Sequence, residues 1–154
     1  MEVIQRDREF EIEVVESMAT AGYSGTPLAR KLGVKDAQRT WRYRMPATVA
    51  KEISVSGVKP TLLKSPESGI DMAHVFVTRR DDLAKLLATL RAVLARNGVI
   101  WVSWPKKAAN IPTEITEDVV RAEAFPLGLV DIKVCAVDET WSGLKLVIRR
   151  SERA

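Results

Sequence analysis

The fold is decided by the stretch Val99-Ile100-Trp101-Val102-Ser103-Trp104. It follows Asn97-Gly98 and stops at Pro105, so it is a short apolar segment bounded by residues that favour turns. Valine, isoleucine and tryptophan suit a pleated surface that is apolar on both sides. The stretch therefore predicts a buried strand inside a sheet, with Trp101 and Trp104 on opposite faces.

The segment before this strand predicts an amphipathic helix from about Asp81 to Arg96. Its leucines and valines recur at spacings of three and four, as on the buried face of a helix. Asp81 and Asp82 favour the positive N-terminus, and Asn97-Gly98 is expected to end the helix. A helix that leads directly into a buried strand is typical of a parallel α/β unit.

Patterns elsewhere in the chain predict further strands and helices. Trp41, Tyr43 and Met45 alternate with Arg42 and Arg44, so this strand should have one apolar and one solvated face. The other predicted strands cover residues 61–64, 73–78, 129–137 and 144–149, and the other predicted helices cover 27–32, 46–53 and 113–125. In the helix over 27–32, Thr26 is expected to cap, Pro27 to occupy the first position and Gly33 to follow the end.

The order of these elements predicts an α/β fold, a Rossmann-like three-layer sandwich. Strands alternate with helices over most of the chain, which requires right-handed crossovers and a mainly parallel sheet. The last two strands are joined by the short loop 138–143, so we expect them to form a C-terminal antiparallel hairpin. With 154 residues, the chain should form one domain over residues 20–154, preceded by a polar arm over 1–19.

The polar arm is acidic and the segment that follows it is basic. Residues 2–16 contain six carboxylates and two arginines, whereas residues 30–44 contain six basic side chains and one aspartate. Residues 10–14 alternate between apolar and acidic, which leaves open an edge strand, a helix or a disordered tail. The charge pattern fits either two solvated segments that partly neutralise each other or a patch for an anionic ligand.

The composition excludes several classes of protein. Cys135 and His74 are the single cysteine and histidine, so no internal disulfide and no Cys/His zinc site is expected, and we predict no metal and no cofactor. No apolar stretch approaches the roughly 20 residues that would span a bilayer, and the N-terminus is charged. We therefore expect a cytoplasmic protein without membrane contact. His74, at the start of a predicted strand, is expected to be packed and hydrogen-bonded.

Three segments resemble a bacterial family of domains of unknown function. They are AGYSGTPL at residues 21–28, WVSWPKK at 101–107 and VDETWSGLKL at 137–146. The resemblance covers most of residues 20–150 and implies relatives without an assigned activity. One difference is the half-charged strand at 41–44, where relatives tend to have an apolar strand.

The order of elements from Ala73 onward also looks like the second half of a class I S-adenosylmethionine-dependent methyltransferase. Such enzymes bind the cofactor with a glycine-rich turn after the first strand and a carboxylate after the second. Here the turn is Pro46-Ala47-Thr48, and Glu67 is the candidate carboxylate. We therefore predict that the chain does not bind S-adenosylmethionine.

Three functional hypotheses follow. In the first, a non-catalytic domain binds a small anionic ligand or a protein partner at the carboxyl ends of the strands. In the second, the chain is an enzyme related to methyltransferases, with Asp138, Glu139 and Ser142 as its acid/base candidates. In the third, which we do not expect, aromatic and arginine side chains of the basic segment 30–44 bind nucleic acid. The candidate ligand-binding residues are Arg79, Arg80, Lys106, Lys107, Asp138, Glu139, Trp141 and Ser142.

Overall fold

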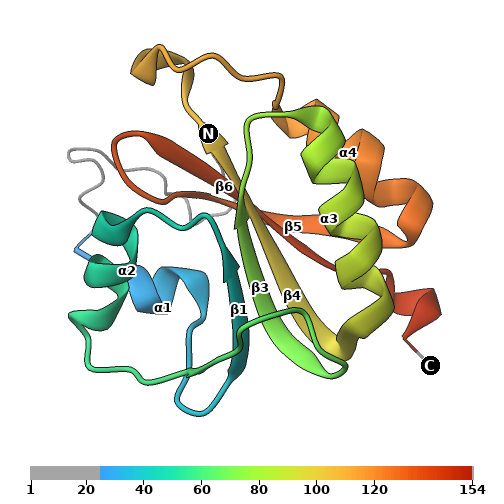
Figure 1. Cartoon of the computed structure of the whole chain (residues 1–154), viewed down its shortest axis with the longest axis horizontal. Helices are drawn as coiled ribbons and strands as arrows, with labels where there is room; N and C mark the ends of the chain where they lie inside the picture. Colours follow the sequence, from blue (N-terminus) through green and yellow to red (C-terminus); the bar gives the residue numbers. More distant parts are fainter. Residues whose placement is uncertain (1–24, 154) are drawn as a thin grey trace.

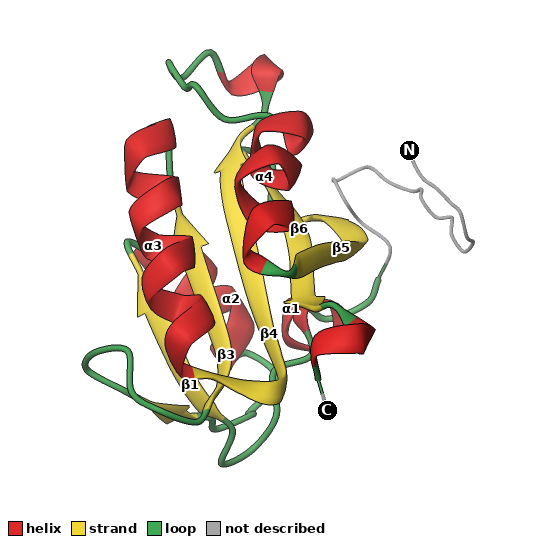
Figure 2. Cartoon of the chain, turned by 90° about the vertical axis from the view of Figure 1, so that its right-hand side faces the viewer, coloured by secondary structure: helices red, strands yellow, loops and turns green. Residues whose placement is uncertain are grey.

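The computed structural model describes residues 25–153, which form a six-stranded sheet with helices on both faces. Helices α1 and α2 cover one face, and α3 and α4 cover the other (Figure 1, Figure 2). The predicted arm over residues 1–19 lies outside the described residues. The strands are β1 Arg39–Tyr43, β2 Thr61–Leu62, β3 Ile70–Phe76, β4 Leu94–Pro105, β5 Leu129–Ala136 and β6 Trp141–Ile148; the α-helices are α1 Leu28–Leu32, α2 Ala47–Ser54, α3 Arg80–Val93 and α4 Glu117–Ala124.

The strand order β2-β1-β3-β4-β6-β5 confirms the predicted fold class. The first four strands in this order are parallel, β6 is antiparallel to β4, and β5 is antiparallel to β6. The sheet is therefore mainly parallel and carries the expected antiparallel hairpin. The short helical turns are η1 Lys107–Ala109, η2 Phe125–Leu127 and η3 Arg150–Glu152.

Strand β4 lies inside the sheet, as its sequence predicts. It pairs with β3 on one side and with β6 on the other. The side chains of Trp101 and Val102 are 0% exposed. Trp101 faces α1, where its indole N–H donates to the carbonyl of Leu32 at 2.8 Å, whereas Trp104 packs in the core on the α3 side. The two indoles therefore lie on opposite faces, as expected.

Each face of the sheet has its own apolar core. On one face, α3 packs Leu83, Leu87 and Leu90 against the strands. On the other face, the core is smaller and includes Leu32 of α1 and Ile53 of α2. Burial of apolar surface on both faces stabilises a parallel sheet, because neither side of its central strands then meets water.

Helix α3 ends earlier than the sequence predicts. It stops at Val93, and β4 begins at Leu94, so the prediction of a helix to Arg96 with its end at Asn97-Gly98 was wrong. The carbonyl of Val93 accepts the backbone N–H of Gly69 at 2.8 Å, and Leu94 pairs with Ile70 at the start of β3. Leu94 continues the helical spacing of apolar residues, but it is buried as the first residue of a strand.

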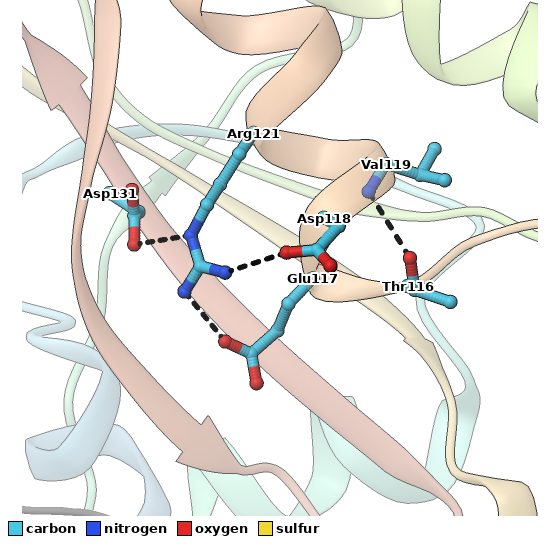
Figure 3. Close-up of polar contacts among 6 residues, drawn as sticks. All are labelled: Thr116, Glu117, Asp118, Val119, Arg121 and Asp131. Carbon is cyan, nitrogen blue, oxygen red and sulfur yellow. Dashed lines mark hydrogen bonds and ion pairs between the residues drawn. The ribbon is translucent and has the colours of Figure 1, made fainter.

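Helix α4 begins later than the sequence predicts, at Glu117 instead of Thr113. The preceding residues are extended because they bind the end of β3: the N–H of Glu114 donates to the carbonyl of Thr78 at 2.8 Å. Thr116 then caps the helix, since its hydroxyl accepts the N–H of Val119 at 3.1 Å (Figure 3).

Arg121 attaches α4 to the edge of the sheet. Its guanidinium donates to Asp131 of β5 at 3.0 Å and to Glu117 and Asp118 of its own helix at 2.7 and 3.2 Å (Figure 3). Burial alone would lower the pKa of Arg121, but the hydrogen bonds and charges of Asp131 and Glu117 outweigh it and raise the pKa. The ion pair therefore fixes the helix against β5.

Two further predictions, for the start of α1 and for the end of β1, need correction. Helix α1 ends at Gly33 with a φ of 78°, as predicted, but Pro27 occupies the N-cap position and Thr26 precedes it. In β1, Trp41 and Tyr43 pack on the α3 side, whereas Met45 joins the core on the α1 side. The alternation ends because Arg44 takes a positive φ of 54° and turns the chain after the strand.

Candidate functional site

The strand order places a topological switch point between β1 and β3. The chain leaves β1 toward β2 on one side and leaves β3 toward β4 on the other. In open parallel sheets, ligands bind outside the carboxyl ends of the strands at such a point. The residues there are Arg44 and Met45 after β1 and Val77 and Thr78 after β3.

The turn after β1 has side chains where a nucleotide-binding turn has glycines. Arg44 is exposed, and its Nε donates to the hydroxyl of Tyr43 at 3.2 Å. Pro46 occupies the N-cap position of α2, with Ala47 as the first helical residue. Arg42, one residue before the strand ends, is half-buried, and this burial lowers its pKa. The turn is therefore cationic and sterically filled.

This site does not fit S-adenosylmethionine, the cofactor of the enzymes that the fold resembles. The cofactor carries a sulfonium cation, which the guanidinium groups of Arg42 and Arg44 would repel. Glu67, the candidate carboxylate for the ribose, forms an ion pair at 3.3 Å with Arg39 at the start of β1. Glu67 thus lies toward the amino end of the parallel strands, opposite the end where the ribose would bind.

The structure separates the predicted ligand-binding residues into two groups, one at the start of α3 and one around the turn between β5 and β6. In the first group, Arg80 forms an ion pair with Glu123 of α4 at 2.6 Å, and its backbone N–H donates to Glu114 at 2.8 Å. Arg79 lies 3.9 Å from Asp81, and both side chains are exposed. Arg80 is thus paired with carboxylates of the α3 and α4 side, whereas Arg79 has one long contact with an exposed carboxylate.

The second group surrounds the turn between β5 and β6. The backbone N–H of Lys106 donates to the carbonyl of Thr140 at 2.8 Å, and Ser142 pairs with Trp104. Burial lowers the pKa of Lys106, and the nearby charges of Asp138 and Glu139 oppose this effect. Lys107, the next residue, is exposed in η1.

One carboxylate of this turn has a structural role. One oxygen of Asp138 accepts the backbone N–H groups of Thr140 and Trp141, both at 2.8 Å, and thereby closes the turn. Strand β6 accordingly starts at Trp141, so the turn is shorter than the predicted loop over 138–143. Glu139 is exposed, and Ser142 lies within β6. Asp138 is therefore a structural residue of the hairpin.

Trp141 folds onto the sheet and closes an aromatic cluster. Its ring meets Phe76 edge-on at 5.0 Å, and Phe76 stacks on His74 at 4.5 Å. His74 is 1% exposed and bonds through Nε2 to Ser103 at 2.8 Å, so the prediction of a packed, hydrogen-bonded histidine is confirmed. Burial, followed by the charge of Arg42, lowers the pKa of His74 to about 3. A histidine so weakly basic, enclosed by aromatic rings, does not suit general base catalysis at neutral pH.

Sequence reasoning missed Lys133 and Lys145, which lie on the α1 side of the hairpin. Lys133 of β5 pairs in register with Lys145 of β6, and its Nζ donates to the carbonyl of Lys31 in α1 at 3.3 Å. Burial and then the charges of Lys133 and Lys35 lower the pKa of Lys145, and the charge of Lys31 contributes to the lowering at Lys106. We call Lys31, Lys35, Lys106, Lys133 and Lys145 the lysine cluster. Among the described residues, none of them forms an ion pair with a carboxylate.

One end of the lysine cluster lines a cavity of about 440 Å³. Lys35 and Lys145 contribute to its wall, together with Asp36, Asp71 and Asn97. Both aspartates already accept backbone N–H groups, Asp36 from Lys59 at 2.8 Å and Asp71 from Arg39 at 2.9 Å. The ammonium groups of Lys35 and Lys145 are therefore the cationic side chains of this wall, and each has donors for a ligand.

Residues 25–153 contain no group of three or more potential metal-ligating side chains, and none of the helices in this part of the chain is long and apolar enough to cross a membrane. Cys135 is buried, which raises the pKa of its thiol and makes the thiolate scarce. Trp41 and Tyr43 pack against the core, on the opposite face from Arg42, whereas the guanidinium of Arg44 lies over the Tyr43 ring, 5.6 Å from its centroid.

Comparisons with known proteins agree with the fold. A family model described as "Protein of unknown function (DUF3052)" matches residues 50–150. An S-adenosylmethionine-dependent methyltransferase from Aquifex aeolicus has a similar structure, with a TM-score of 0.55, 15% identity and coverage of 79% of this chain and 88% of that chain. Magnesium protoporphyrin IX methyltransferase from Synechocystis PCC 6803 gives a TM-score of 0.51 at 9% identity, covering 79% and 74%. No curated protein matches the sequence. At these identities the structural likeness shows the methyltransferase-like fold alone.

Proposed function

The chain belongs to the DUF3052 family of proteins of unknown function, and we propose that it is a non-catalytic domain that binds a small anionic ligand through the lysine cluster. The observation that carries this proposal is the register pairing of Lys133 with Lys145. Like charges that face each other across two strands destabilise a sheet. An anion between the two ammonium groups removes that repulsion, so the folded chain gains stability when it binds one.

Burial favours anion binding at two lysines of the cluster. Lys106 and Lys145 are half-buried, and burial is the largest cause that lowers the pKa of each. A partly desolvated ammonium group interacts more strongly with an anion than an exposed one does, because water screens it less. Lys106 belongs to the ligand-binding residues that the sequence suggests, so the proposal keeps the carboxyl end of β4 as part of the site. Arg79 and Arg80 are not part of it.

The alternative of an enzyme related to methyltransferases has less support. The turn after β1 is filled by Arg44 and Pro46, and the candidate carboxylate Glu67 pairs with Arg39. Asp138 closes a turn, and His74 is buried at a pKa of about 3. The candidate residues of this alternative therefore have structural roles.

Inorganic pyrophosphate is a suitable probe because its phosphates can contact several lysines at once. We expect millimolar pyrophosphate to raise the melting temperature of the chain above that in sodium chloride of equal ionic strength. Lys133→Gln with Lys145→Gln should abolish this difference. A matched control, Lys51→Gln with Lys85→Gln, removes two exposed lysines outside the cluster and should preserve it. Equal melting temperatures in pyrophosphate and chloride, or an equal loss in both double variants, would contradict the proposal.

A further inference from the structure

Strand β5 forms the edge of the sheet next to the lysine cluster. Among the described residues it pairs with β6 alone, so its other side has backbone N–H and C=O groups available for another strand. Two large apolar side chains are exposed on it, Ile132 at 56% and Val134 at 46%. An exposed strand edge with apolar side chains is a docking surface for an extended segment.

The two faces of this edge have different chemistry. Val134 pairs with Leu144, whose side chain belongs to the core on the α3 and α4 side. Lys133 pairs with Lys145, and its Nζ reaches α1 on the other side. A strand that fits this edge must therefore present apolar side chains to one face of the sheet and negative charges to the other.

We propose that residues 9–16 of the same chain dock on the edge of β5 as an added strand. Their sequence is Glu-Phe-Glu-Ile-Glu-Val-Val-Glu, with no basic residue. In an extended conformation, Glu9, Glu11 and Glu13 lie on one face, and Phe10, Ile12 and Val14 lie on the other. The acidic face matches Lys133 and, one strand further in, Lys145, and the apolar face matches Val134.

The connection is long enough for this docking. Residues 17–24 separate the acidic segment from the first described residue, and eight extended residues span roughly 26 Å. Lys31 in α1 lies next to Lys133, so the chain enters the described part close to β5. Charge complementarity and reach thus favour the chain's own segment.

A second copy of the chain fits the same edge less well. Two β5 strands that pair with each other would bring the Lys133 side chains of both copies to one face, where like charges repel. The docking goes beyond the proposed function, because it requires no external ligand. An external anion and the docked carboxylates would compete for Lys133 and Lys145.

The test uses the full-length chain and hydrogen exchange of the β5 amides that do not bond to β6. In the native chain we expect these amides to be protected. Glu9→Lys, Glu11→Lys and Glu13→Lys together should remove the protection, and the addition of Lys133→Glu and Lys145→Glu should restore it. Lys51→Glu with Lys85→Glu, added to the same triple variant, is the matched control and should not restore it.

Carbodiimide cross-linking provides a second measurement that does not depend on the variants. We expect amide links from Glu11 or Glu13 to Lys133 or Lys145 within one chain. Unprotected β5 amides in the native chain, protection that survives the triple reversal, or links found between two chains only would overturn the docking. Pyrophosphate binding is scored separately, in the triple variant, where no glutamate competes for Lys133 and Lys145: its absence there contradicts the proposed function and leaves the docking intact.

Discussion

His74 and Ser103 are joined by a 2.8 Å hydrogen bond across the neighbouring parallel strands β3 and β4. Both side chains are almost fully buried, and Phe76 and Trp101 lie against the imidazole. The bond satisfies two polar groups in an apolar environment, and such groups are costly to bury without a partner. It also keeps His74 where water does not reach, so solvation cannot stabilise a positive charge on the imidazole.

The buried histidine should make stability fall in mildly acidic solution. The pKa of His74 is about 3 in the folded chain and 6.5 in the unfolded chain, so below pH 6.5 the unfolded state binds a proton that the native state does not. The contribution of neutral His74 to the free energy of unfolding is complete above pH 6.5 and is lost as the pH falls toward 3. The slope approaches about 1.4 kcal/mol per pH unit. Urea denaturation between about pH 6.5 and 5, where most carboxylates stay ionised, measures it.

His74→Gln is the control for this pH dependence. Glutamine can still hydrogen-bond to Ser103, but it does not titrate. His74 is the single histidine of the chain, so the variant should have a nearly flat stability in the same pH range. An unchanged slope in His74→Gln would show that another group carries the effect.

The burial of β4 predicts a large difference between two identical substitutions. Val102 is 0% exposed inside the sheet, and Val55 is 72% exposed at the end of α2. Val102→Thr places a hydroxyl without a partner in the core and should cost about 1–3 kcal/mol of unfolding free energy. Val55→Thr should stay within about 0.5 kcal/mol. Equal unfolding free energies for the two variants in urea titrations would contradict the burial of β4. Val102→Asp should leave little soluble protein.

The cap of α4 gives a smaller and more local prediction. Thr116→Ala removes the acceptor for the N–H of Val119 and should cost about 1 kcal/mol. Thr116→Ser retains the hydroxyl and should preserve most of the stability. The comparison is made by thermal or urea denaturation of both variants. If serine and alanine are equally destabilising, the hydroxyl does not cap the helix.

Local patterns predicted most of the elements of this fold. The apolar stretch 99–104 identified the central strand, and the leucine spacing identified α3, because burial of a strand or of a helix face leaves a periodic record in the sequence. The ends of the helices were less predictable. Helix α3 ends at Val93, whose carbonyl bonds to Gly69, a residue distant in sequence. Helix α4 begins after Thr116, which caps it. The periodicity of apolar residues does not report such hydrogen bonds.

Lys133 and Lys145 were missed as a pair because their pairing depends on the register of the hairpin. A hairpin that closed at Val137 and Leu144 would have paired Lys133 with Ile148. The turn that Asp138 closes instead pairs Lys133 with Lys145. Lys31 and Lys35 join them only after α1 has packed on the sheet. The length of one turn thus decides which charges meet.

The last prediction is that the chain does not bind S-adenosylmethionine, although its fold resembles that of methyltransferases. The cofactor needs backbone N–H groups close to it after the first strand, and glycine permits that approach. Here Arg44 and Pro46 fill the turn, proline lacks an N–H, and the nearby guanidinium groups repel a sulfonium. A ligand at a hundred times its dissociation constant stabilises a protein by about 2.7 kcal/mol, or several degrees for a domain of this size. We expect no such shift in thermal denaturation with millimolar S-adenosylmethionine, and a clear upward shift that calorimetric titration reproduces would refute this account of the turn.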